Sequence, residues 1–290
     1  MSGQRELLEP GSLRGLCLGI SVSESADLGR LGLVETHLRL ALAEASRAMM
    51  ISGARILYGG RLDPAGYTSF LRAEMEKYSR RDRPLTLCLA WQEHRRIPIA
   101  DLAGAEDDLG LYGNIIYLSA DGQEVARDFE RTELGELIED PRVREQALTA
   151  LREYMTTKSH ARLLVGGKCA GYDGRYPGVV EEAMISIETG RPLFLAGGFG
   201  GATLEVARVL GLDPQHYLGV IGADKVRDPG LSEGLARIEA AAQEVGWRAQ
   251  SNGLSGEENR RLAATHRPSE VASLVALGLG RSNLNERPAQ

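Results

Sequence analysis

The sequence predicts an α/β fold: a Rossmann-like, doubly wound parallel sheet with helices on both faces and a C-terminal helical extension. Short apolar runs alternate with longer segments of helical periodicity, which is the pattern of parallel strands joined by crossover helices. The 35 glycines cluster after apolar runs, where such chains turn from strand to helix. Hydrophobic residues form 43% of the 290 residues, enough for a sizeable core.

The expected elements follow in order along the chain. Each short apolar run is interpreted as a strand, which gives strands at residues 15–22, 55–58, 85–91, 114–119, 162–165, 192–196 and 217–221. Helices are expected to begin near residues 33, 64, 141, 177, 201, 229, 255 and 268. Gly53 follows the first helix as a terminator, and Ser255 and Glu258 have the spacing of a capping box.

The same patterns suggest a division of the chain. Residues 1–12 are interpreted as a polar leader, 13–225 as the α/β domain and 226–290 as the helical extension. Between residues 92 and 139 the pattern weakens, although one strand is still expected there. The acidic run at residues 106–108 is expected to be a solvated loop, so no metal site and no cofactor are expected.

Composition excludes several classes of function. The net charge is −6 and no long basic stretch occurs, so nucleic acid is not an expected partner. No apolar run approaches the roughly 18 residues that span a bilayer, and the first residues lack the apolar core of a signal peptide. Cys17, Cys88 and Cys169 are odd in number and widely spaced, which favours a reduced, cytoplasmic setting.

A ligand site is expected where the strands end. In open parallel sheets, ligands bind beyond the carboxyl ends of the strands, and several glycine-rich loops of this chain leave strands at that edge. The candidate ligand-binding residues are Ser21, Ser23, Gly59, Gly60, Arg61, Lys168, Asp173, Gly178, Glu181, Gly197, Gly198, Phe199, Gly200 and Gly201. The region 161–210 carries two such strand-to-helix turns and is the centre of the predicted site.

Several of these residues allow a structural as well as a functional interpretation. Glu181 and Glu182 lie in the first turns of a helix, where acidic residues also stabilise the helix dipole. Phe199, among four glycines, could stack on a base or fold back onto the core. Ser21 and Ser23 could meet phosphate or ribose, or only form a turn and a helix cap.

Two further observations limit the chemistry. The sequence His94-Arg95-Arg96 follows the third strand on the ligand edge, but a solvated loop is the favoured interpretation. None of the glycine-rich loops matches a Walker A motif or a G-x-G-x-x-G fingerprint, so neither ATP hydrolysis nor hydride transfer has specific support.

The stretch LLVGG…GRYPGVVEEAMISIETGRPLFL resembles the second motif of the SLOG superfamily, a Rossmann-like group named for SMF/DprA and LOG proteins. LOG phosphoribohydrolases carry P-G-G-x-G-T-x-x-E there, which makes Glu182 the matching glutamate. The run RILYGGRLDPAGYTSFL is similar to the first motif, and the resemblance covers roughly residues 13–225. Val179 replaces the motif threonine, and Gly174-Arg175-Tyr176 replaces the Pro-Gly-Gly run. Compared with the enzyme members of the superfamily, the segment at about residues 92–139 is interpreted as an insertion.

These departures make the chain look closer to the nucleotide-sensing SLOG members, such as the domains of TRPM channels and of bacterial antiphage effectors. The resemblance then implies sensing of a nucleotide or of an NAD- or ADP-ribose-derived ligand, as in an antiphage signalling system. The alternative is an N-glycoside hydrolase or ribosyl transferase of the phosphoribohydrolase type, with Glu182 and Arg175 as catalytic residues. In either case the resemblance implies a homodimer or higher homo-oligomer, because SLOG proteins commonly pair.

Overall fold

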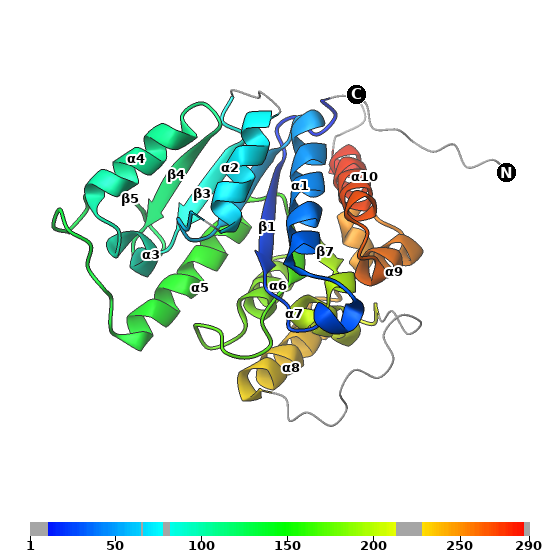
Figure 1. Ribbon diagram of the computed structural model, residues 1–290. Helices are drawn as coiled ribbons and strands as arrows, with labels where there is room; N and C mark the ends of the chain where they lie inside the picture. Colours follow the sequence, from blue (N-terminus) through cyan, green and yellow to red (C-terminus); the bar gives the residue numbers. More distant parts are fainter. Residues whose placement is uncertain (1–10, 65, 78–81, 213–227, 287–290) are drawn as a thin grey trace.

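The computed structural model describes residues 11–64, 66–77, 82–212 and 228–286, and it confirms the Rossmann-like α/β fold (Figure 1). Seven strands form one sheet in the order β5-β4-β3-β2-β1-β6-β7. All neighbouring strands are parallel except β5, which pairs with β4 in the antiparallel direction. The strands are β1 (Cys17–Ser23), β2 (Arg55–Gly59), β3 (Leu85–Leu89), β4 (Gly113–Leu118), β5 (Glu124–Val125), β6 (Ala161–Gly166) and β7 (Leu193–Ala196).

The order of the strands places a topological switch beside β1. From β1 the chain adds β2, β3 and β4 on one side, and a helix then returns it to the other side of β1, where β6 and β7 follow. In β1 and β6, Leu18 pairs with Ala161 and Ser23 pairs with Gly166, so the two strands end at the same level. A crevice at this point is where sheets of this kind bind ligands.

Helices cover both faces of the sheet (Figure 1). One face is covered by α1 (Glu35–Ile51), α2 (Tyr67–Lys77), α4 (Ile99–Leu109) and α10 (Pro268–Glu286). The other is covered by α3 (Trp91–Arg95), α5 (Pro141–Lys158), α6 (Gly178–Glu188), α7 (Gly201–Val209) and α8 (Pro229–Glu244). The remaining helix, α9 (Gly256–Ala264), lies against β7 and the 3-10 turn η2 (Gly197–Phe199).

Alternating side chains of the strands explain the two layers. In β6, Leu163 and Val165 join the large cluster beneath α1 and α10, whereas Leu164 packs against α6 and α7. Successive side chains of a strand point to opposite faces, so a strand covered on both faces is apolar almost throughout. This is why the sequence of β6 is a nearly continuous apolar run, in which Arg162 is the one charged residue.

The expected strands are found in the described residues, with local differences. Trp91, placed in the third strand from its sequence, instead begins α3, because the strand ends at Leu89. Within the stretch interpreted as an insertion, β4 forms as expected and pairs with β3 from Leu85 to Leu89. The strand expected at residues 217–221 lies outside the described residues, and the division of the chain near residue 225 stays a prediction.

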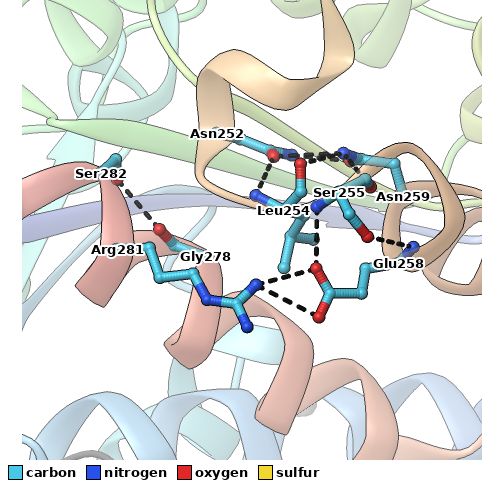
Figure 2. Close-up of polar contacts among 8 residues, drawn as sticks. All are labelled: Asn252, Leu254, Ser255, Glu258, Asn259, Gly278, Arg281 and Ser282. Atoms are coloured by element: carbon cyan, nitrogen blue, oxygen red, sulfur yellow. Dashed lines mark hydrogen bonds and ion pairs between the residues drawn. The ribbon is translucent and has the colours of Figure 1, made fainter. Parts of the chain in front are cut away.

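Polar contacts join the C-terminal segments to one another (Figure 2), and one further contact joins them to the sheet. The capping box at the start of α9 is confirmed, since Ser255 Oγ accepts from the Glu258 amide and the Ser255 amide donates to Glu258 Oε2. Arg281 of α10 donates to the same carboxylate at 2.9 Å. Buried Asn252 donates to Asn259 and to the carbonyl of Leu193 in β7, which joins these helices to the sheet edge.

Within the part of the chain that the structure describes, no helix has both the length and the apolar character needed to cross a membrane.

Candidate functional site

A cavity of about 430 Å³ opens at the carboxyl edge of the sheet, at the switch beside β1. Its walls come from the ends of β1 and β2, from α3, from α5, from the loop after β6 and from the first turns of α6. A volume of this size lies within the range of small-molecule pockets, about 300 to 1,000 Å³. The chain therefore has a formed cavity at the position that its topology favours for ligand binding.

The structure brings most of the predicted ligand-binding residues together around this cavity. They belong to four parts of the chain: the end of β1, the end of β2, the loop after β6 and the first turns of α6. The predicted residues that line it are Ser21, Ser23, Gly59, Gly60, Arg61, Lys168, Asp173, Gly178 and Glu182.

The second glycine-rich loop, residues 197–201, lies elsewhere. Its helix start is already occupied, because Asp27 Oδ2 accepts from the Gly201 amide at 2.8 Å. The Cα atoms of Gly197 and Gly198 lie so close to the backbone of residues 263–265 that an added Cβ would come within 2.6 Å of a carbonyl oxygen. These glycines therefore allow close approach of the chain's own backbone. The prediction that this loop binds the ligand is corrected, because the loop does not line the cavity.

Phe199 is also corrected as a stacking residue. Its side chain is 0% exposed and belongs to the core cluster beneath α1 and α10. Burial of this large ring stabilises the fold by about 2 kcal/mol or more, which favours the core over an exposed loop. No face of the ring is open to a base.

Glu181 faces α5 and not the cavity. Its carboxylate forms an ion pair with Arg152 and accepts from Thr149 Oγ1 at 2.5 Å. Both Glu181 and Arg152 are buried, and Arg152 also lines the cavity through its own side chain. The predicted ligand contact of Glu181 is therefore replaced by a structural ion pair between two helices.

Arg175 is not the partner of Glu182. It lies on the surface, 57% exposed, where its Nη2 donates to Glu233 of α8 at 2.7 Å. The residue that does pair with Glu182 is Arg162 of β6, with Nη1 3.1 Å from Glu182 Oε1. Burial lowers the pKa of the Arg162 guanidinium, and the charge of Glu182 acts in the opposite direction.

The rim of the cavity carries a network of charges. Glu93 of α3 lies 3.2 Å from Arg61 Nε and 2.8 Å from Arg96 Nη2, and Arg61 Nη2 donates to Asp173 at 3.1 Å. All four residues line the cavity. Each of the two arginines is therefore paired with a carboxylate, and an anionic ligand could take the place of that carboxylate. Lys168, also on the rim, is 3.7 Å from Glu24.

The sequence His94-Arg95-Arg96 is divided between core and cavity. Only Arg96 lines the cavity, while Arg95 donates to Glu136 and to the carbonyl of Phe129. His94 is fully buried, and its Nε2 lies 2.9 Å from the Leu118 carbonyl oxygen. The pKa of His94 is lowered to about 4, mainly by burial; the hydrogen bond to Leu118 opposes the shift, and the charges of Arg131 and Arg95 add to it.

This pKa predicts a loss of stability in mild acid. The unfolded state takes up a proton near pH 6.5, whereas folded His94 stays neutral down to about pH 4, so stability is lost as the pH falls between these values. Between pH 7 and pH 5 we expect wild type to lose about 2 kcal/mol more than a His94→Phe variant, measured by urea unfolding. Equal losses in the two proteins would contradict the assignment.

Sequence reasoning missed several residues that complete the site, Arg162, Arg152 and Glu93 among them, whereas Arg96 was already expected on the ligand edge. The available signal was Arg162, since an arginine inside a strand that is otherwise apolar must find a buried partner. Over the described ranges, no group of His, Cys, Asp and Glu side chains is arranged to hold a metal ion.

The comparisons with known proteins agree with this architecture. A family model described as SLOG cluster2 matches residues 12–262, a range that contains the whole sheet and every residue of the cavity. No curated protein sequence matches the chain. With most of its length matched and its cavity at the switch point of a Rossmann-like sheet, the chain belongs to the SLOG family, in the group described as cluster2.

Proposed function

We propose that this chain binds a nucleotide-type ligand, a mononucleotide or an NAD- or ADP-ribose-derived compound, in the cavity at the switch beside β1. The observation that carries the proposal is the convergence of six parts of the chain on one cavity, with cations at its rim and the Glu182 carboxylate in its wall. Membership of the SLOG family supports nucleotide-related binding or processing in general terms.

The distribution of charge supports one orientation of the ligand. Arg61, Arg96 and Lys168 lie on the rim, and arginine binds phosphate through paired hydrogen bonds. Near Glu182 a phosphate would meet a negative carboxylate, whereas a sugar hydroxyl can donate to it. We therefore propose that the phosphates lie at the rim and the sugar next to Glu182.

We further propose that the chain forms a homodimer or higher homo-oligomer, which light scattering can test.

The test is direct binding to the purified full chain. The protein is incubated with nucleoside monophosphates, NAD and ADP-ribose, exchanged into fresh buffer and analysed by mass spectrometry for retained and altered compounds. We expect one compound to be retained intact and to raise the melting temperature at millimolar concentration. Arg61→Met should weaken retention, whereas Arg175→Met, outside the cavity, should not. If every compound passes through without raising the melting temperature, the proposal fails.

Cleavage of the ligand is the second candidate, and the position of Glu182 favours it. One oxygen of this carboxylate faces Arg162, and the side chain lines the cavity, as a group that stabilises or attacks an oxocarbenium-like centre must do. The N-glycosidic bond would break, water would add to the sugar carbon, and the base would leave with a proton. Release of free base that Glu182→Gln reduces at least about 100-fold would establish an enzyme.

A further inference from the structure

Arg162 is a fully buried cation in β6, the strand between β1 and β7. Its side chain is 0% exposed and projects from β6 on the face that α5 and α6 cover. An isolated buried charge is very costly, so a buried arginine requires a partner of opposite charge and acceptors for its N–H groups. The groups that the Arg162 guanidinium contacts therefore indicate its role.

Two of these contacts fix the guanidinium to α5. Nη2 donates to the backbone carbonyl of Arg152 at 3.0 Å and to Thr156 Oγ1 at 2.8 Å. Because the guanidinium is planar, fixing one of its edges also fixes the direction of the other N–H groups. The remaining terminal nitrogen, Nη1, is directed toward the cavity side of the sheet by this anchor.

The other two contacts reach groups that line the cavity. Nη1 donates to Ser21 Oγ at 3.1 Å and lies 3.1 Å from Glu182 Oε1. A guanidinium is only a donor, so the Ser21 oxygen accepts and its own O–H remains to donate elsewhere. Among the residues that the structure describes, Glu182 Oε2 has no hydrogen-bonding partner, so it is left to accept.

We propose that Arg162 is a positioning residue that presents Glu182 and Ser21 to the ligand as an adjacent acceptor and donor, a pair that matches the two neighbouring hydroxyls of a ribose. Each hydroxyl can both donate and accept, so one can donate to Glu182 while the other accepts from Ser21. The inference rests on the proposed function and adds to it that the ligand is a ribonucleotide distinguished from its deoxy form.

The experiment compares AMP with 2′-deoxy-AMP, and ADP-ribose with 2′-deoxy-ADP-ribose, by isothermal calorimetry. Wild type should prefer the ribo form by about tenfold or more, because a site built to bind a hydroxyl is left with unpaired groups when the hydroxyl is missing. Arg162→Met should reduce this preference to about twofold, and Arg162→Lys should restore part of it. Arg175→Met, a surface arginine paired with Glu233, is the control and should keep the full preference.

The ratio of the affinities for the ribo and deoxy ligands separates a positioning role of Arg162 from a merely structural one. If Arg162 only supported the fold, Arg162→Met would lower the melting temperature and weaken both ligands while the ratio stayed the same, and this result overturns the inference. Should Arg162→Met fail to fold, Ser21→Ala gives the same test, because it removes the proposed donor and leaves the buried arginine paired with Glu182. An unchanged ratio in Ser21→Ala also overturns the inference. If wild type binds none of these four compounds but retains another member of the panel above, the same ratio is measured with that compound and its 2′-deoxy form. If wild type retains no member of the panel, the proposed function fails, and the inference fails with it.

Discussion

Replacement of Gly198 by alanine is expected to lower the free energy of unfolding by more than about 4 kcal/mol, or to prevent folding altogether. An added Cβ would lie 2.1 Å from the carbonyl oxygen of Thr265 and 2.3 Å from its carbonyl carbon. These are backbone atoms in the connection between α9 and α10, so no change of side-chain rotamer relieves the clash. Urea unfolding followed by circular dichroism measures the loss.

Gly104→Ala is the matched control. Gly104 lies inside α4, and no atom comes within 4 Å of the Cβ that alanine would add. Alanine is favoured over glycine in a helix interior by about 1 kcal/mol, so this variant should be more stable than wild type. A Gly198→Ala protein that unfolds within about 1 kcal/mol of wild type would show that α9 does not pack on this loop as described.

The second large effect is expected at Arg152. Arg152→Met removes the partner of Glu181, whose carboxylate is buried between α5 and α6. Breaking a buried pair from one side leaves an uncompensated charge and costs about 3 to 5 kcal/mol. The double variant Arg152→Met/Glu181→Gln removes both charges and should recover most of this loss, because glutamine retains an oxygen for Thr149.

An exposed pair of the same type gives the comparison. Arg175 and Glu233 are 57% and 49% exposed, and surface pairs contribute about 0 to 1 kcal/mol. Arg175→Met should therefore change the unfolding midpoint in urea very little. Equal destabilisation by Arg152→Met and Arg175→Met would mean that the pair at Glu181 is open to solvent, contrary to its burial.

The fold and the position of the site could be predicted because both depend on local patterns. Apolar runs mark the strands, and the carboxyl ends of parallel strands meet at one edge, which brings Ser21, Gly59 and Lys168 together without knowledge of side-chain contacts. Membership of the SLOG family was likewise predicted from the motif around Glu182, and the family model agrees.

The charge partners could not be predicted, because they depend on which helix packs on which strand. Arg162 and Glu182 are on neighbouring elements, but only the packing of α6 over β6 shows that they pair. The choice between the two interpretations of Phe199 could not be made from the sequence for a related reason. Glycines permit close approach to a ligand or to another part of the chain, and only the position of α9 decides between the two.

The two edges of the sheet limit how copies of this protein can assemble. At one edge β5 has only two residues, Glu124 and Val125, too few for a stable strand pairing with another chain. At the other edge α9 lies against β7, and Asn252 already donates to the Leu193 carbonyl. Strand pairing between copies through β5 or β7 is thus disfavoured, so we expect a dimer of this chain to be joined through other surfaces.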